Sequence, residues 1–212
     1  MTRLLTTAAL VLALSAPAYA ASAAPVGAKI WVEKGTCLEG EKNICVEVHL
    51  EGDILQGDAA RFAQIVRDAH APMERTTVVL NSLGGRVYDG IMIAAIVHEA
   101  KWATFVDHDR VCASACAEIW LAGRIRYSSP SARIGFHTMY QNVGNKKLRD
   151  DKGNEELLPF YRKIGISDKA ARIFAAADPD DMLWMDFGLA SKLGIDVVEW
   201  PPKKPVTENA AK

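Results

Sequence analysis

The chain has 212 residues, of which half are hydrophobic, so it can bury one substantial core, and its length requires no second domain. Its 25 Lys and Arg residues are balanced by 26 Asp and Glu residues, and they form no basic stripe. Because this balance gives no electrostatic support for nucleic-acid binding, we expect no nucleic-acid partner.

The N-terminal segment has the features of a secretory signal peptide. Arg3 precedes an apolar run from Leu4 to about Ala16, and residues 18–20 (Ala-Tyr-Ala) supply a small-x-small cleavage pattern. The run is shorter than the ~20 apolar residues that a membrane-spanning helix needs. We therefore expect residues 1–20 to be removed, leaving a secreted protein in the periplasm or outside the cell, without membrane attachment.

Alternating strand and helix patterns follow, which is typical of an α/β protein. Residues 21–28 are expected to be a flexible N-terminus, and residues 29–200 a single domain. In the first half of this domain, hydrophobic periodicity and turn residues predict the elements in this order: strands at 30–33 and 44–50, a helix capped by Asp58, a strand at 77–80, a helix from Val87, a strand at 103–106, a buried helix ending at Gly123, and strands at 125–127 and 132–137.

The second half of the domain begins with a polar and charged stretch at residues 142–154. Peripheral helices are predicted at 157–164 and, after a Ser167 cap, at 170–176. A short strand at 183–185, a helix at 187–193 and a strand at 195–200 complete the prediction. The tail, residues 201–212, is rich in proline and charge, which is typical of disorder.

Four cysteines are present, and an exported protein can keep disulfides. Cys37 and Cys45 flank a polar loop between two strand-like runs, so we predict that they staple a hairpin. Cys112 and Cys116 bracket Ser114, and a local bridge between them is a hypothesis that depends on the turn geometry. Redox gating of the serine by this pair is a further hypothesis.

No metal site and no cofactor are expected. No histidine lies at ligand spacing from either cysteine pair. His98 and His108 have too few neighbouring ligands for zinc or calcium, and Asp107-His108-Asp109 is typical of a polar loop.

The segment 111–116 is a turn of small residues between an apolar strand and an apolar helix. It places Ser114 at a helix N-terminus, where backbone N–H groups lack helical acceptors and the macrodipole favours negative charge. Such a position can stabilise an oxyanion. The alternative interpretation is an ordinary helix cap, because serine is among the preferred N-cap residues.

Two other features can complete a serine site. Gly84 and Gly85 follow a buried strand. Glycines at such a position permit a positive φ or let a ligand approach the bare backbone, and the alternative interpretation is a tight turn. No Lys-Ser or Lys-Thr follows them, which argues against a phosphate-binding loop. His137 ends another apolar strand and can supply a general base, although a structural histidine is the alternative.

Together, four ordered segments resemble the proteolytic subunit of the Clp protease. They keep the family's order and similar spacings: Asn81–Gly90, Ala113–Ser114, Leu121–Gly123 and Ser129–His137. The resemblance covers roughly residues 77–194. It implies an α/β fold of the Clp/crotonase type, in which ββα units form a superhelix.

The resemblance also implies roles for individual residues. Ser114 is the nucleophile, His137 is the base, and the backbone N–H groups of Gly85 and Ala115 form the oxyanion hole. Counting back from Ala190 and Gly194, Asp181 is the nearest match for the acid.

Asp180 and Asp178, which closely precede Asp181 in the sequence, are the next candidates for the acid. For all three aspartates, the alternative is a place in a solvated loop without a catalytic role. The sequence also departs from the family: Leu83 stands where the family usually has proline. The region between His137 and these aspartates is shorter than the segment that joins two rings in the family. The sequence leaves open whether the protein forms a homo-oligomer, but we do not expect a double ring.

The sequence therefore predicts an exported serine peptidase of the Ser-His-Asp type that hydrolyses peptides or unfolded polypeptides, which the family binds as an added β-strand. ATP is not expected after export, so we expect no ATPase partner. Two alternatives stay open. One is a binding or scaffolding member of the fold without turnover, and the other is acyl-CoA chemistry of the crotonase type, which export disfavours.

Overall fold

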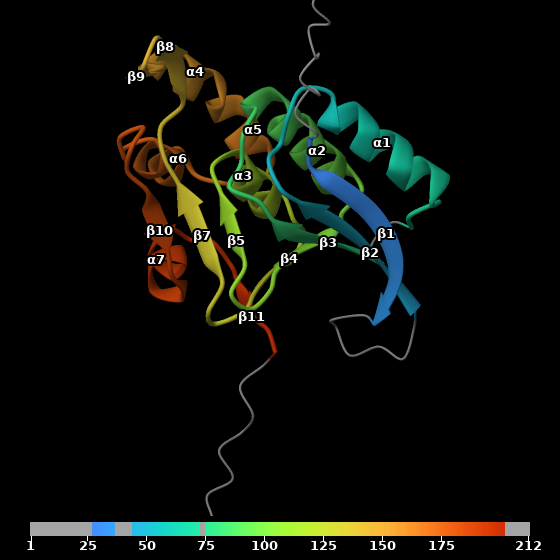
Figure 1. Ribbon diagram of the computed structural model, residues 1–212. Coiled ribbons are helices and arrows are strands. Elements are labelled where there is room, and N and C mark those ends of the chain that lie inside the picture. Colours follow the sequence, from blue (N-terminus) through green and yellow to red (C-terminus); the bar gives the residue numbers. More distant parts are fainter. Residues whose placement is uncertain (1–26, 37–43, 73–74, 202–212) are drawn as a thin grey trace, which may run out of the picture.

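The computed structural model describes residues 27–36, 44–72 and 75–201 (Figure 1). The predicted signal peptide, Cys37 and the tail from residue 202 lie outside the described residues. No helix in the described part of the chain is both long enough and apolar enough to span a membrane.

The larger sheet has six strands in the order β1-β2-β3-β4-β6-β11. β1 and β2 are antiparallel, and every later neighbour pair is parallel. The strands are β1 (Lys29–Thr36), β2 (Ile44–Glu51), β3 (Thr76–Asn81), β4 (Ala103–Val106), β6 (Arg126–Ser128) and β11 (Val198–Glu199).

A second sheet has three strands in the order β10-β7-β5. They are β5 (Val111–Ala113), β7 (Arg133–Phe136) and β10 (Leu183–Met185). From β4 to β7, consecutive strands alternate between the two sheets: β4 and β6 belong to the larger sheet, and β5 and β7 to the smaller one. A separate antiparallel hairpin consists of β8 (Tyr140–Val143) and β9 (Lys146–Arg149).

Seven helices occur in the described residues: α1 (Asp58–Asp68), α2 (Val87–Glu99), α3 (Ala115–Leu121), α4 (Asp151–Glu156), α5 (Leu158–Lys163), α6 (Asp168–Phe174) and α7 (Phe187–Lys192). The predicted cap of α6 is confirmed, since the Ser167 hydroxyl accepts the N–H of Ala170 at 3.2 Å. The predicted cap of α1 is wrong by one residue. Gly57 holds the N-cap position, because the Asp58 carboxylate accepts the N–H groups of Ala28 and Leu55 instead.

The core is built around α3, whose seven residues are all buried and which contacts strands of both sheets (Figure 1). Its apolar surface packs with fully buried side chains of β3 and α2, such as Leu80 and Ile93. The helices α5 and α6 are less peripheral than predicted, because Tyr161 and Phe174 join the same core.

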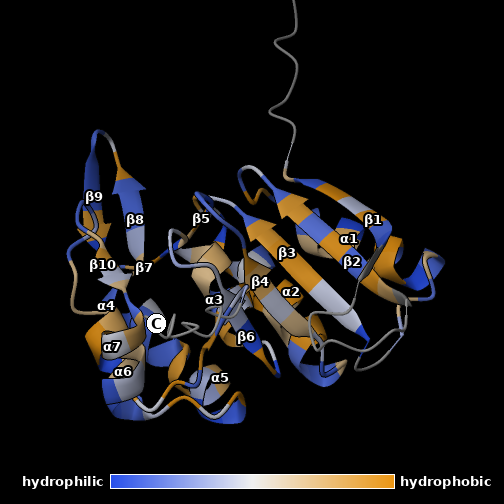
Figure 2. Ribbon diagram, turned by 90° about the horizontal axis from the view of Figure 1, so that it is seen from below, coloured by the Kyte–Doolittle hydropathy of each residue, from blue (hydrophilic) through white to orange (hydrophobic). Residues whose placement is uncertain are grey.

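The polar stretch predicted at residues 142–154 contains regular structure that its composition does not indicate. It holds most of the β8–β9 hairpin, which turns at Gly144 with φ 60°, and the start of α4. Figure 2 shows this hairpin largely in the hydrophilic colours, in contrast to β3. At the C-terminal end, only Val198–Glu199 of the strand predicted at 195–200 is a strand, and these residues pair with Tyr127 and Ser128 of β6.

Candidate active site

Backbone hydrogen bonds join the end of β3 to the serine turn. The Ser82 N–H donates to the Val111 carbonyl at 2.7 Å, and the Ala113 N–H donates to the Ser82 carbonyl at 3.0 Å. The Ser82 hydroxyl in turn accepts the N–H of Gly84 at 3.0 Å. The glycine pair, which is 30 residues before the serine turn in sequence, is thereby fixed beside it.

Ser114 occupies the N-cap position of α3, but its side chain makes no capping hydrogen bond. Its backbone has φ 55° and ψ −129°, and its N–H donates to the Gly135 carbonyl at 2.9 Å. A non-glycine residue in such a sparsely populated region costs about 1–3 kcal/mol. The interpretation of Ser114 as an ordinary helix cap is therefore wrong, and helix capping does not explain its strained backbone conformation.

Gly84 and Gly85 both have positive φ, at 95° and 138°. A Cβ at Gly84 would lie 2.7 Å from the Ser114 Cβ, so only glycine permits this approach. A Cβ at Gly85 would overlap the carbonyl of Ile54, which accepts the N–H of Arg86 at 2.8 Å.

Two backbone N–H groups at this junction have no acceptor. Within the described residues, neither Gly85 nor Ala115 donates its N–H to the protein. Both residues and Ser114 line one cavity of about 800 Å³, a volume typical of ligand sites. The arrangement provides two donors for a developing oxyanion beside a strained serine.

His137 follows β7, is half-buried and lines the same cavity. Its Nδ1 lies 2.7 Å from the Thr138 carbonyl oxygen. Because a carbonyl only accepts, Nδ1 carries the proton in this contact, and Nε2 of the neutral ring is left as an acceptor. This is the tautomer that a general base for serine requires.

The predicted acid is not brought to His137. Asp181 is exposed, is not among the residues that line the cavity, and accepts the N–H of Met182 at 2.8 Å. Asp180 forms an ion pair with Lys147 at 2.8 Å, and Asp178 is also exposed. The Thr138 carbonyl occupies the Nδ1 contact that an acid would take, so the role of Asp181 stays a prediction.

Sequence reasoning missed a buried carboxyl group in the cavity. Glu118, one helical turn after Ser114 on α3, lines the cavity together with Tyr161 of α5. The Tyr161 hydroxyl donates to Glu118 Oε1 at 2.8 Å. Burial raises the pKa of Glu118 to about 7. The available signal was that Glu118 is the one charged residue in an otherwise apolar helix.

The Cys112–Cys116 disulfide is present, with a Cα–Cα distance of 5.1 Å, and both residues are fully buried. It joins the end of β5 to the first turn of α3, so it spans Ser114. Cys45 is also disulfide-bonded, while its predicted partner Cys37 lies outside the described residues. The local bridge that the sequence left as a hypothesis is thus confirmed.

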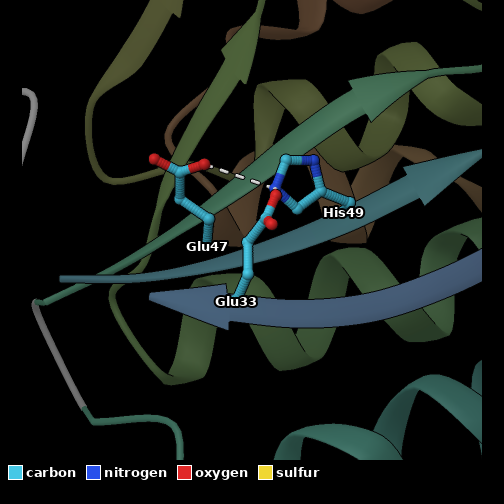
Figure 3. Close-up of side chains that lie close together, drawn as sticks. All are labelled: Glu33, Glu47 and His49. Carbon is cyan, nitrogen blue, oxygen red and sulfur yellow. Dashed lines mark ion pairs between the residues drawn. The ribbon is translucent and has the colours of Figure 1, made fainter. Parts of the chain in front are cut away.

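One side-chain cluster has the composition of a metal site, although none is expected from the sequence. Glu33, Glu47 and His49 gather on the β1–β2 pair (Figure 3), with ligand atoms within 4.8 Å of one another. His49 Nε2 lies 2.6 Å from Glu33 Oε1 and 3.3 Å from Glu47 Oε2. Both carboxylates lie within ion-pair distance of His49 Nε2, but among the described residues this buried nitrogen has no partner in hydrogen-bond geometry.

Strands that alternate between two sheets, with a serine at a strand-to-helix turn, define a Clp/crotonase-type α/β fold, which the chain shares with solved protease structures. Two of these are structures of the 1510-N membrane-bound stomatin-specific protease, each 18% identical to this chain.

One of the two is a serine-to-alanine mutant, with a TM-score of 0.53, covering 71% of this chain and 76% of that chain. The other is a lysine-to-alanine mutant in complex with a substrate peptide, with a TM-score of 0.51 and coverage of 71% and 72%. No protein-family model and no curated protein matches the sequence.

Proposed function

We propose that the chain is an exported serine peptidase that hydrolyses peptides or unfolded polypeptides without ATP. One observation carries this proposal: Ser114 is held in a strained, uncapped conformation at the N-terminus of a buried helix, in a cavity that also contains His137. The fold shared with this protease, one of whose structures is a complex with a substrate peptide, supports a peptide as the ligand.

In the proposed reaction, Ser114 Oγ attacks the scissile carbonyl carbon while His137 Nε2 accepts the hydroxyl proton. The oxyanion of the tetrahedral intermediate accepts hydrogen bonds from the N–H groups of Gly85 and Ala115. His137 then gives the proton to the leaving amine, and water releases the acyl group from Ser114 by the reverse sequence. The Thr138 carbonyl holds the imidazole in the required tautomer.

Export is part of the proposal. Its support is the signal-like sequence of residues 1–20 and the buried Cys112–Cys116 disulfide, a bond that persists in oxidising compartments. ATP is not expected there, so the proposed substrates are peptides or chains that are already unfolded. Such substrates bind this fold family as an extended strand.

Labelling with a fluorophosphonate tests the nucleophile. We expect the mature protein, residues 21–212, to form an adduct that peptide mass spectrometry maps to Ser114. Ser114→Ala removes the adduct, and His137→Ala slows labelling about a hundredfold or more, because a general base contributes 10²–10⁴ in rate. His108→Ala, which removes an exposed histidine outside the cavity, is the matched control and should label at the wild-type rate.

An unlabelled but folded wild-type protein would refute the proposed activity, as would a labelling rate that does not depend on His137. Circular dichroism establishes folding for each variant.

Peptide binding without turnover is a second candidate function. The observation that favours it is that Asp181 is exposed, does not line the cavity and forms no hydrogen bond with His137 among the described residues. This candidate predicts that the wild-type protein binds peptides, and that Ser114→Ala leaves all measurable hydrolysis unchanged.

A further inference from the structure

One residue that lines the cavity, Glu118, has an unpaired carboxyl oxygen buried in the protein. Glu118 is 8% exposed, and its Oε2 is a buried atom without a hydrogen-bond partner among the described residues. Its other oxygen accepts the Tyr161 hydroxyl at 2.8 Å. Tyr161 is itself only 4% exposed. The pair is thus a rigid polar group with one free acceptor.

An unsatisfied buried acceptor costs about 1–3 kcal/mol, and more when it is charged. Glutamine, leucine or methionine at position 118 would fit a helix without the penalty of burying a carboxylate. The unpaired oxygen therefore lowers the stability of the folded protein, and folding by itself does not explain a glutamate at this position. A ligand group that donates a hydrogen bond to it would remove this cost.

Part of the cavity lining is apolar. Leu157, Ala171 and Ala175 line the cavity together with Glu118 and Tyr161, and they come from the α4–α5 junction and from α6. Small and aliphatic walls that lead to a single carboxyl group match a side chain with a long aliphatic stem and a cationic end. Lysine and arginine have this form.

The other charged groups of the cavity favour a cation as well. Asp53 and Asp150 also line it, whereas the lining cation Arg86 is already paired with Asp89 at 3.0 Å. Both Asp150 oxygens are occupied, by the Gly153 N–H and the Gln141 amide, so Glu118 holds the free buried acceptor.

We propose that the unpaired oxygen of Glu118 binds the cationic end of a lysine or arginine side chain of the substrate, which makes this part of the cavity a subsite for basic residues. The proposal rests on the proposed function, because it assigns the substrate preference of the same site. Glu118 acts in binding and takes no part in the bond-breaking step.

Affinity for matched peptides tests the subsite separately from turnover. The probes are two fluorescently labelled alanine-rich heptapeptides, one with lysine and one with norleucine at the centre. Norleucine has an aliphatic stem without the amine. Fluorescence anisotropy measures both affinities for the Ser114→Ala protein at pH 8. We expect the lysine peptide to bind about tenfold or more tightly, as a charge-assisted hydrogen bond predicts.

Two variants in the same background identify the group responsible. Glu118→Gln keeps the size of the side chain and an acceptor for Tyr161, and should reduce the lysine preference to about twofold or less. Asp53→Asn removes a carboxylate that is exposed at the cavity, and should lower the lysine preference less than Glu118→Gln does. Tyr161→Phe keeps Glu118 and should retain the preference.

The outcomes are distinguishable. A lysine preference that survives in Glu118→Gln overturns the proposal, and so does an equal loss in Asp53→Asn, which would indicate the general negative charge of the cavity. If both peptides bind the Ser114→Ala protein equally, the subsite is refuted even where fluorophosphonate labels wild-type Ser114. If wild-type Ser114 is not labelled, the peptidase proposal fails, and the lysine preference still decides the role of Glu118.

Discussion

At the scale of single residues, the site combines two unfavourable features one helical turn apart. Ser114 has strained backbone angles, and Glu118 is a carboxyl group in a fully buried helix. Glu118 lies on α3 and Ser114 is its N-cap; because the core packs around this helix, surrounding contacts can hold both residues in place. Unfavourable residues that a well-packed core maintains are characteristic of functional sites.

The buried acid predicts a specific dependence of stability on pH. Burial raises the pKa of Glu118 from 4.5 to about 7. Between these values the folded protein keeps a proton that the unfolded chain has lost, so ionisation in the unfolded state favours unfolding. The contribution of Glu118 to stability is full below pH 4.5, falls as the pH rises to 7, and is constant above.

Glu118→Gln cannot ionise and should lack this decline. The free energy of unfolding of the variant minus that of the wild type should increase by roughly 3 kcal/mol from pH 4.5 to pH 8, since each pKa unit corresponds to about 1.4 kcal/mol. Urea denaturation at several pH values measures this difference. A difference that stays constant with pH would show that Glu118 is not buried as a neutral acid.

At the scale of elements, the site is a contact between two turns. The turn after β3 contains Gly84, and the turn before α3 contains Ser114. A Cβ on Gly84 would lie 2.6 Å from the Ala113 carbonyl oxygen. A side chain at position 84 would therefore displace the backbone next to Ser114.

Gly84→Ala should therefore destabilise the protein and slow the labelling of Ser114 about tenfold or more. Gly52→Ala is the matched control, because Gly52 has the same φ of 95° but no atom within 4 Å of the added Cβ. We expect about 1 kcal/mol of destabilisation in the control, from the positive φ alone. In Gly84→Ala, overpacking should add about 1–3 kcal/mol.

Thermal unfolding and fluorophosphonate labelling measure both effects. If the two alanine variants lose the same stability and label at the same rate, the contact between the turns does not determine the serine conformation.

At the scale of the whole molecule, the β8–β9 hairpin extends from the fold and lines the cavity through Tyr140, Gln141 and Asn142. Its strands pair only with each other within the described residues, and every residue from Gln141 to Arg149 is exposed. The hairpin contributes little to the core, so its contribution is expected to lie in peptide binding.

Shortening the hairpin tests this division of roles. Replacing residues 142–147 by Asn-Gly keeps the Gln141–Leu148 pair and closes it with a favourable two-residue turn. The free energy of unfolding should change by about 1 kcal/mol or less, since surface positions contribute little. The heptapeptides should bind the Ser114→Ala protein more weakly. An unchanged peptide affinity would place the binding surface elsewhere.

Much of the fold was predictable because local patterns and tertiary packing agree. The apolar runs of β3, β4 and β7 are strands in the structure, and the helix pattern that follows Val87 is α2. The same holds for the Ser167 cap, which depends on residues within one turn. The hairpin at 140–149 was missed because its exposed strands lack the apolar alternation that identifies a half-buried strand.

The candidate site was predictable only in part. Ser114, His137, Gly85 and Ala115 meet in one cavity, as the order of the sequence segments implied. The contact between Glu118 and Tyr161 was missed, because a pair 43 residues apart leaves no local pattern, and the single charge in an apolar helix was the one signal for Glu118. Asp181 was inferred by counting from other segments, and a distance along the chain does not specify where a loop lies in space.

The sequence by itself determined the strand and helix pattern, the serine turn with its two cysteines, and the glycine pair, because these depend on residues near one another in the chain. Only the tertiary structure decided that the serine hydroxyl caps nothing, that a backbone carbonyl contacts His137, and that Glu118 lines the cavity and has a buried oxygen without a partner among the described residues. The physical reason is that tertiary packing decides backbone angles, side-chain orientation and burial, even where the hydrogen-bond partner is the next residue, as Thr138 is for His137.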